Sequence, residues 1–100
     1  MGNREETIVT VIMSTYNGSS YLASQLESLL AQKDVAIRLF VRDDGSSDDT
    51  VQILQQYTHR FLSLDIIEEE NLGATESFHL ASQLALEKND PADYYAFCDQ

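Results

Sequence analysis

The sequence predicts an α/β fold: an open parallel sheet in the order β-α-β-α-β-α-β, with helices on both faces. Short apolar runs rich in strand-forming residues alternate with stretches of helical spacing. A glycine follows each of the first three runs, at Gly18, Gly45 and Gly73, at nearly equal intervals. Because glycine tolerates positive φ, it suits a tight turn from strand to helix. Parallel strands connected in this way are joined by right-handed crossovers.

The expected strands are four short runs, at residues 7–13, 36–41, 62–67 and 94–98. The first two runs are apolar on both faces, as a sheet covered by helices on both sides requires.

The stretches between the strands carry apolar residues at i, i+3/i+4 and i+7, so each is expected to form a helix packed on the sheet. These positions are Leu22, Leu26, Leu29 and Leu30, then Val51, Leu54 and Tyr57, then Phe78, Ala81, Leu84 and Ala85. We expect serine caps on the first two helices, from Ser19 or Ser20 and from Ser46 or Ser47. The third helix is expected to end before Pro91, because the residue before a proline avoids the helical region.

Composition limits the classes of protein. The chain has 100 residues, of which 43% are hydrophobic, enough for a single domain with a core. We expect residues 1–6 to be disordered. No run is long enough to cross a membrane, and the N-terminus shows no signal-peptide pattern. The single cysteine, Cys98, allows no internal disulfide, which favours a reducing compartment.

The charge is strongly acidic, −11 from 17 acidic and 6 basic residues. This argues against a nucleic-acid partner, because binding the nucleic-acid backbone needs a basic face. The run from Glu68 to Glu70 is expected to be a solvated loop. His59 and His79 have no nearby partner at metal-ligand spacing, and the chain has neither a GxGxxG nor a P-loop motif.

Polar residues follow the first two strands, at the sheet edge where ligands bind in open α/β folds. We expect Asp44 to accept a hydrogen bond from a base N–H or a ribose hydroxyl. Asp43 fits either a ligand contact or a turn former, since two adjacent carboxylates repel each other. Asp48 and Asp49 are interpreted as structural, in the first turn of a helix whose dipole favours negative charge. Tyr16 offers an aromatic face to a base, and such stacking contributes about 1–3 kcal/mol.

Four motifs together resemble a known family. They are residues 11–18 (VIMSTYNG), 41–50 (VRDDGSSDDT), 71–73 (NLG) and 97–100 (FCDQ). In this order and spacing they look like the N-terminal part of a family 2 glycosyltransferase, and the resemblance extends from Thr7 to the end of the chain. Members of this family are inverting enzymes with the GT-A fold. The resemblance implies a Rossmann-like half with the sheet order 3-2-1-4 that binds a nucleotide-sugar donor.

The resemblance also assigns residues. Ser14 and Tyr16 match positions that contact the base, and Asp44 matches the acid that binds the pyrimidine N3–H. Asp99 matches the first acid of the Asp-x-Asp motif, which holds a divalent metal, Mg²⁺ or Mn²⁺, against the donor diphosphate. The expected nucleotide-binding set is Ser14, Thr15, Tyr16, Asn17, Asp43, Asp44 and Gly45. No Lys or Arg lies between Arg60 and Lys88, so we expect diphosphate binding to depend on the metal.

The family's second metal-binding acid, its general base and its acceptor-binding half have no counterpart in these residues. We therefore expect a truncated donor-binding part that has no catalytic residue and is inactive alone. The resemblance implies a UDP- or dTDP-linked donor and a saccharide acceptor, and the Cys-Asp-Gln ending is most like rhamnosyltransferases of bacterial surface polysaccharide. We expect a cytoplasmic location, or a peripheral one at the inner membrane face for a full-length protein. The strand at residues 94–98 would leave an apolar edge that self-associates or is partly disordered.

Two alternatives share the alternating pattern. A receiver-like or flavodoxin-like binding module also has acidic strand ends, but a receiver carries its acid pair after the first strand. A sugar nucleotidyltransferase usually has a glycine-rich basic loop after the first strand, and here no Lys or Arg follows that strand before Lys33.

Overall fold

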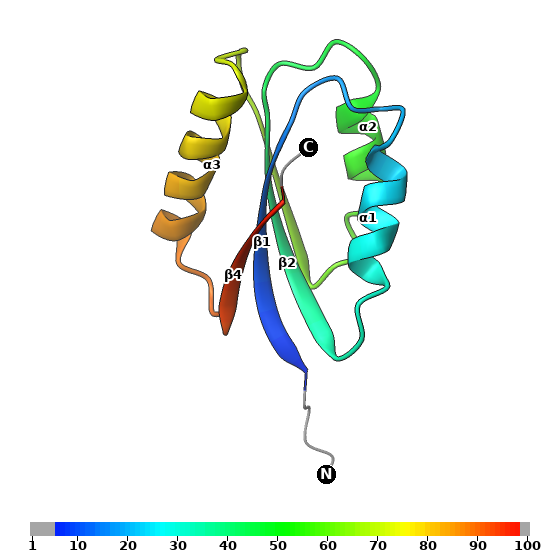
Figure 1. Cartoon of the computed structure of the whole chain (residues 1–100), viewed down its shortest axis with the longest axis vertical. Helices are drawn as coiled ribbons and strands as arrows, with labels where there is room; N and C mark the ends of the chain where they lie inside the picture. The colour runs from blue at the N-terminus through cyan, green and yellow to red at the C-terminus, as the bar shows by residue number, and fades with distance from the viewer. Residues whose placement is uncertain (1–5, 99–100) are drawn as a thin grey trace.

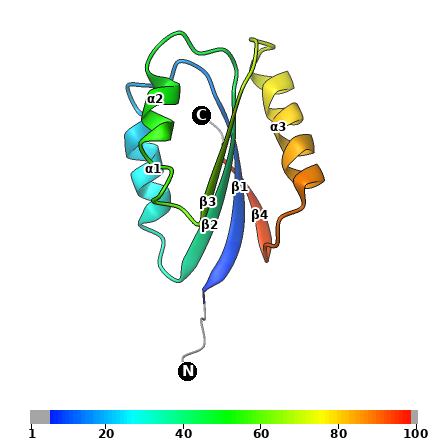
Figure 2. The same cartoon turned by 180° about the vertical axis from the view of Figure 1, so that it is seen from behind.

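The computed structural model describes residues 6–98, and its strands form one all-parallel sheet in the order β3-β2-β1-β4. Along the chain the elements are β1 (Thr7–Thr15), α1 (Leu22–Leu30), β2 (Val35–Asp43), α2 (Thr50–Gln55), β3 (Ser63–Glu68), α3 (Ala74–Lys88) and β4 (Tyr94–Cys98). Helices α1 and α2 cover one face of the sheet and α3 covers the other (Figures 1 and 2). The predicted fold class and the sheet order are confirmed. Residues 1–5, most of the segment expected to be disordered, lie outside the described range.

The core has two layers, one on each face of the sheet. The larger layer packs β1 and β2 against α1 and α2, and it includes Met13, Leu26 and Leu54, all fully buried. The smaller layer lies under α3 and contains Ile12, Phe40, Ala81 and Ala85. Because neighbouring residues of a strand point to opposite faces, an unbroken apolar run supplies both layers at once. The apolar stripes expected for α1 and α3 are confirmed. In the second helix Leu54 is buried as expected, but Val51 is only half-buried, and α2 ends at Gln55, before the buried Tyr57.

The first two strands extend further than expected, through the polar residues at their ends. Strand β1 runs to Thr15 and β2 runs to Asp43, and these two residues pair in register. The Thr15 hydroxyl donates to an Asp43 carboxylate oxygen at 2.7 Å, so the polar ends of the ladder are satisfied across the strands. The consequence is that Ser14, Thr15, Arg42 and Asp43 belong to the rigid sheet and not to loops.

The first expected cap is wrong. Helix α1 begins at Leu22 after an N-cap residue, Tyr21, that makes no side-chain cap bond. The chain enters the helix through a turn in which the Gly18 carbonyl oxygen accepts from the Tyr21 and Leu22 N–H groups. A backbone turn therefore replaces the serine cap.

The second expected cap is also wrong, and the helix starts later than the pattern indicates. Helix α2 begins at Thr50, so Asp48 and Asp49 precede its first turn. The Asp48 carboxylate accepts from the Thr50 N–H and hydroxyl and from the Ser19 N–H, which joins the two loops. The hydrogen bond from the Thr50 hydroxyl holds the pKa of Asp48 down, at about 2.

Helix α3 has the boundaries that its flanking residues predict. Gly73, with φ +96°, precedes Ala74, and Asn89 takes the left-handed conformation after Lys88, two residues before Pro91. No helix in residues 6–98 is both long enough and apolar enough to cross a membrane.

Candidate functional site

A pocket of about 220 Å³ opens at the carboxyl ends of β1 and β2. It is lined by Ser14, Thr15, Tyr16, Tyr21, Asp44, Ala74 and Phe78. In the sheet, β1 has β2 and β3 on one side and β4 on the other, so the strand order reverses beside it. Open α/β sheets bind ligands at such a point, outside the carboxyl ends of the strands. Since sites that enclose drug-sized ligands span about 300–1,000 Å³, this open pocket fits part of a ligand, such as a nucleoside.

Tyr16 and Tyr21 form the aromatic wall of the pocket. Their side chains are 50% and 44% exposed, so ring surface is available to a ligand. Phe78 of α3 contributes a further ring to the lining and makes an edge-to-face contact with Phe97, with ring centroids 5.5 Å apart. The pocket can therefore accept a flat, partly apolar group.

Asp44 is the acid of the pocket, and it is only 1% exposed. Its Oδ1 accepts from the Arg42 guanidinium at 2.7 Å and from the Leu72 N–H at 2.8 Å. Its Oδ2 accepts from the Gly73 N–H at 3.1 Å and from the Asn71 amide at 3.2 Å. Burial alone would raise the pKa of this carboxyl, but the hydrogen bonds from Leu72, Arg42 and Gly73 outweigh it and lower the pKa. Asp44 is thus an ionised acceptor at neutral pH.

Arg42 is as deeply buried as Asp44, at 1% exposed, although it is charged. Besides Asp44, its guanidinium donates to the Ser77 hydroxyl at 2.7 Å, to Glu69 at 3.1 Å and to the Glu70 carbonyl at 3.0 Å. Ser77 in turn shares a 2.6 Å hydrogen bond with Ser14. One buried network therefore joins β1, β2, α3 and the loop at residues 69–73.

The sequence analysis missed Arg42 and Ser77. The signal for Arg42 was a charged residue at the end of a strand, directly after three apolar residues (39–41), in a chain with only 6 basic residues. Ser77 gave no signal, because a serine on a helix is ordinarily solvent-exposed. Glu69 also differs in part from the expected solvated loop, since its carboxylate, though exposed, pairs with Arg42.

Asp43 is equally buried, at 2%, but has different partners. Its carboxylate accepts from the Thr15 hydroxyl at 2.7 Å and from the Ser46 hydroxyl and N–H at 2.7 and 2.9 Å. It does not line the pocket. The arrangement makes Asp43 a brace between the end of β1 and the loop that follows β2.

Asn17 and Gly45 also lie outside the pocket lining and shape the two loops. Asn17 has φ +47°, and its side-chain oxygen accepts from the Ser47 N–H at 2.8 Å. Gly45 has φ +79°, and a Cβ there would lie 3.0 Å from the Asn71 backbone nitrogen. Of the residues expected to bind nucleotide, Ser14, Thr15, Tyr16 and Asp44 line the pocket, whereas Asn17, Asp43 and Gly45 do not.

The expected metal ligand, Asp99, lies outside the described residues. Within residues 6–98, no three His, Cys, Asp or Glu side chains are grouped so that they could hold a metal ion. Strand β4 ends at Cys98, which pairs in register with Met13, so the chain leaves β4 beside the strand residue that precedes Ser14.

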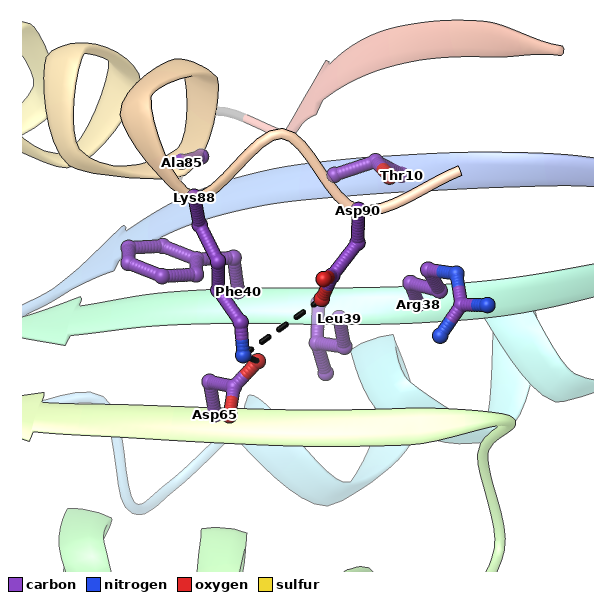
Figure 3. A pocket seen from close by; sticks show the side chains of 8 residues that line it. All are labelled: Thr10, Arg38, Leu39, Phe40, Asp65, Ala85, Lys88 and Asp90. Atoms are coloured by element: carbon purple, nitrogen blue, oxygen red, sulfur yellow. Dashed lines mark hydrogen bonds and ion pairs between the residues drawn. The ribbon is translucent and has the colours of Figure 1, made fainter. Parts of the chain in front are cut away.

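The amino-terminal half of the sheet carries a different polar cluster (Figure 3). There, Lys88 at the end of α3 pairs with Asp65 of β3 at 3.0 Å and with Asp90 at 3.4 Å. Arg38 of β2 donates to the Pro91 carbonyl at 2.9 Å. The space between these groups is about 10 Å³, room for one water molecule at most, so this cluster fastens the end of α3 to the sheet and leaves no ligand pocket.

Comparison with known proteins supports the resemblance. A sequence model of the family described as "Glycosyl transferase family 2" matches residues 10–100. The chain is 37% identical over 92 residues to the dTDP-rhamnosyl transferase RfbG of Shigella flexneri, covering 88% of this chain and 31% of that protein. It is 34% identical over 93 residues to the Bacillus subtilis glycosyltransferase TuaG, whose name assigns it to teichuronic acid biosynthesis, covering 92% and 35%. It is 31% identical over 77 residues to an Escherichia coli chondroitin synthase, covering 77% and 11%. The chain thus spans about a third, or less, of the length of these relatives.

Proposed function

Because the chain belongs to glycosyl transferase family 2, we propose that its pocket at the ends of β1 and β2 binds the nucleoside diphosphate of a sugar donor. The observation that carries the proposal is a buried, ionised Asp44 facing a pocket with an exposed Tyr16. A fixed acceptor beside an aromatic face matches a nucleobase, which presents N–H groups at its edge and a flat ring. Family membership decides against the receiver-like, flavodoxin-like and nucleotidyltransferase alternatives.

In the proposed complex, Tyr16 stacks on a uracil or thymine and Asp44 accepts the N3–H of the base. The two bases present the same N3–H, so these contacts suit UDP- and dTDP-linked donors alike. The sugar is transferred to a saccharide acceptor with inversion, as the acceptor oxygen displaces the nucleoside diphosphate from the opposite side of the anomeric carbon. No residue of the described chain is assigned as the base for that step.

The metal part of the proposal depends on Asp99. Mg²⁺ and Mn²⁺ are hard cations that take carboxylate and phosphate oxygens, and Mg²⁺ is often bound by one or two carboxylates together with substrate phosphates. A single carboxylate with a donor diphosphate fits that pattern. When bound, the metal would stabilise the charge that develops on the leaving diphosphate.

The relatives suggest where such a transfer would act. RfbG is named for rhamnosyl transfer and TuaG for teichuronic acid biosynthesis, both in bacteria. We therefore place the proposed activity in bacterial cell-surface polysaccharide synthesis, on the cytoplasmic side of the membrane. With a net charge of −11, we propose no nucleic-acid partner.

A ¹⁵N-HSQC titration with UDP and dTDP, with and without Mg²⁺, tests the donor site. We expect shifts at Ser14, Tyr16 and Asp44. Tyr16→Ala should weaken UDP binding about tenfold, because stacking contributes about 1–3 kcal/mol per base. Tyr94→Ala is the matched control, an exposed tyrosine near the other end of the sheet, and should bind as the original chain does. Saturating UDP that shifts none of the pocket residues would contradict the proposal.

Self-association through β4 stays a prediction. The side chains of Tyr94 and Phe97 are 66% and 59% exposed, and β4 is one of the two edge strands of the described sheet. Exposed apolar edges tend to pair with other strands. Sedimentation velocity should therefore show dimers that Phe97→Lys disperses. A monomer at all concentrations, with β4 amides protected from exchange, would argue against it.

A further inference from the structure

Arg42 lies behind the pocket and does not line it. Its guanidinium is fully buried and contacts Asp44, Ser77, Glu69 and the Glu70 carbonyl. A buried ion pair often contributes little to stability, because desolvation offsets the attraction of the charges. A deeply buried arginine that contacts a ligand-facing carboxylate is therefore a candidate for a role in binding.

In the pair of Arg42 and Asp44, the guanidinium offsets the charge of the hydrogen-bond acceptor that lines the pocket, while the second carboxylate on Arg42, that of Glu69, is exposed to solvent. Without the guanidinium, the carboxylate would stand as a buried, uncompensated anion near an anionic donor, in a chain that is already strongly acidic. With it, the pair is neutral and still accepts hydrogen bonds. That combination suits the N–H of a neutral base better than it suits a phosphate.

The contacts of Asp44 show how its carboxylate is held. The two short hydrogen bonds, from Arg42 and the Leu72 N–H, both fix Oδ1. The two longer bonds go to Oδ2, and one of these donors, the Asn71 amide, also donates to the Asp44 main-chain oxygen at 3.1 Å. Asn71 can give up Oδ2 and keep its other bond. Oδ2 is therefore the oxygen available to a ligand N–H while Arg42 holds Oδ1 in place.

The same guanidinium nitrogen that contacts Asp44 also contacts Ser77, which is bonded to Ser14. Asp44 and Ser14 both line the pocket, and Ser77 lies on α3, which supplies Ala74 and Phe78 to the same lining. Arg42 is thus the shared support of the polar groups in the pocket.

We propose that Arg42 is a positioning residue for base recognition, which acts on the donor through Asp44 and, by way of Ser77, through Ser14, without touching the nucleotide itself. The inference rests on the proposed function, because it assumes that a nucleoside diphosphate binds here. It predicts that Arg42 controls how strongly the chain distinguishes a base that has an N3–H from one that lacks it.

The test compares UDP with 3-methyl-UDP, in which a methyl group replaces the N3 hydrogen, by isothermal titration calorimetry. The original chain should bind UDP at least about tenfold more tightly, as a hydrogen bond to a charged group predicts. Arg42→Met keeps most of the bulk and removes the guanidinium, and it should reduce the preference to less than about twofold. Arg38→Met is the matched control on the same strand, with the same change of charge, and should keep the full preference.

A double-mutant comparison separates this role from a general loss of stability. In an Asp44→Asn background, adding Arg42→Met should change UDP affinity by less than about twofold, since the residue through which Arg42 acts is already altered. If Arg42→Met does not fold, Arg42→Lys gives the answer. Lysine keeps the charge but cannot span Asp44, Ser77 and Glu69 at once, so most of the preference should still be lost.

The outcomes distinguish the two proposals. An Arg42→Met or Arg42→Lys chain that keeps the full preference for UDP would overturn the positioning role and leave the donor site intact. An original chain that binds neither nucleotide would overturn the proposed function itself.

Discussion

Asp43 and Asp44 are neighbours in sequence, both almost completely buried, and they do different things. Asp43 is held by neutral donors, the Thr15 hydroxyl and the hydroxyl and N–H of Ser46. Asp44 is held by a guanidinium, and its other partners belong to the loop before α3. The difference shows that the partners of a carboxylate, and not its place in a motif, decide whether it braces a loop or faces a pocket.

The alternating direction of the side chains at the end of β2 explains how two adjacent buried acids can be accommodated. Successive side chains of a strand point to opposite faces, so the two carboxylates reach separate sets of donors. The repulsion expected for adjacent acids is offset on each side by short hydrogen bonds. The polar rim of the sheet therefore consists of two independent clusters, which we call the Asp43 cluster (Thr15, Asp43, Ser46) and the Asp44 cluster (Arg42, Asp44, residues 69–73, Ser77).

Removing either acid should lower the free energy of unfolding, by a larger amount for Asp44 than for Asp43. Asp44→Ala leaves Arg42 buried without its main counter-charge, and we expect a loss of about 3–5 kcal/mol in the free energy of unfolding. Asp43→Ala leaves only neutral donors unsatisfied, at a cost of about 1–3 kcal/mol. Urea unfolding followed by circular dichroism measures both. Equal losses would contradict the distinction between the clusters.

Two glycines allow the Asp44 cluster to be disturbed without changing a charge. Gly45→Ala would place a Cβ 3.0 Å from the Asn71 nitrogen at a φ of +79°, so we expect about 2 kcal/mol of destabilisation together with weaker UDP binding. Gly73→Ala also strains a positive φ, but its Cβ would meet nothing within 4 Å, so it should cost about 1 kcal/mol. Thermal unfolding of the two variants measures which one is less stable. A larger loss of stability in Gly73→Ala than in Gly45→Ala would refute the steric argument.

Much of the fold could be predicted, because periodicity and glycine placement act locally. The runs that became β1 and β2 are apolar on both faces, and the stripe on α3 with Pro91 beyond it fixes that helix closely. The serine caps were wrong because the loops after β1 and β2 bond to each other. The Ser46 hydroxyl donates to Asp43 and the Ser47 N–H donates to Asn17, and helix α2 starts only at Thr50.

The candidate site was predicted in part. Ser14 lies at the end of β1, and Tyr16 and Asp44 directly follow β1 and β2, so the rule for parallel sheets brings them to one edge. Arg42 and Ser77 could not be identified as its supports, since their contact joins β2 to a helix 35 positions away in the chain, which only the packing of α3 on the sheet creates. A sequence motif therefore identifies the residues that face a ligand more easily than it identifies the residues that support them.

The metal prediction separates the base end of the donor site from its phosphate end. We expect UDP affinity to fall about tenfold or more in excess EDTA, because residues 61–87 offer no cation to the diphosphate. Uridine, which reaches the Asp44 cluster but carries no phosphate, should bind equally with and without metal. Fluorescence or calorimetric titration measures both ligands. UDP affinity that is unchanged by the chelator would contradict the metal requirement and leave base recognition intact.

Acid titration should give the smallest effect, and it compares Asp44 with Asp48, a half-buried acid in the loop before α2. The pKa of Asp44 is lowered in the folded chain, mainly because hydrogen bonds from Leu72 and Arg42 outweigh its burial. Its contribution to stability is therefore complete above the unfolded value of about 3.9 and is lost as pH falls through the folded pKa. Asp48, with a pKa of about 2, contributes to stability with the same dependence on pH.

We expect Asp44→Asn and Asp48→Asn each to flatten the decline in unfolding free energy below about pH 4, whereas only Asp44→Asn should also reduce UDP binding at pH 7. A decline as steep in Asp44→Asn as in the original chain would show that this carboxyl does not bind its proton more weakly in the folded state, and the charged pair with Arg42 would then have to be abandoned.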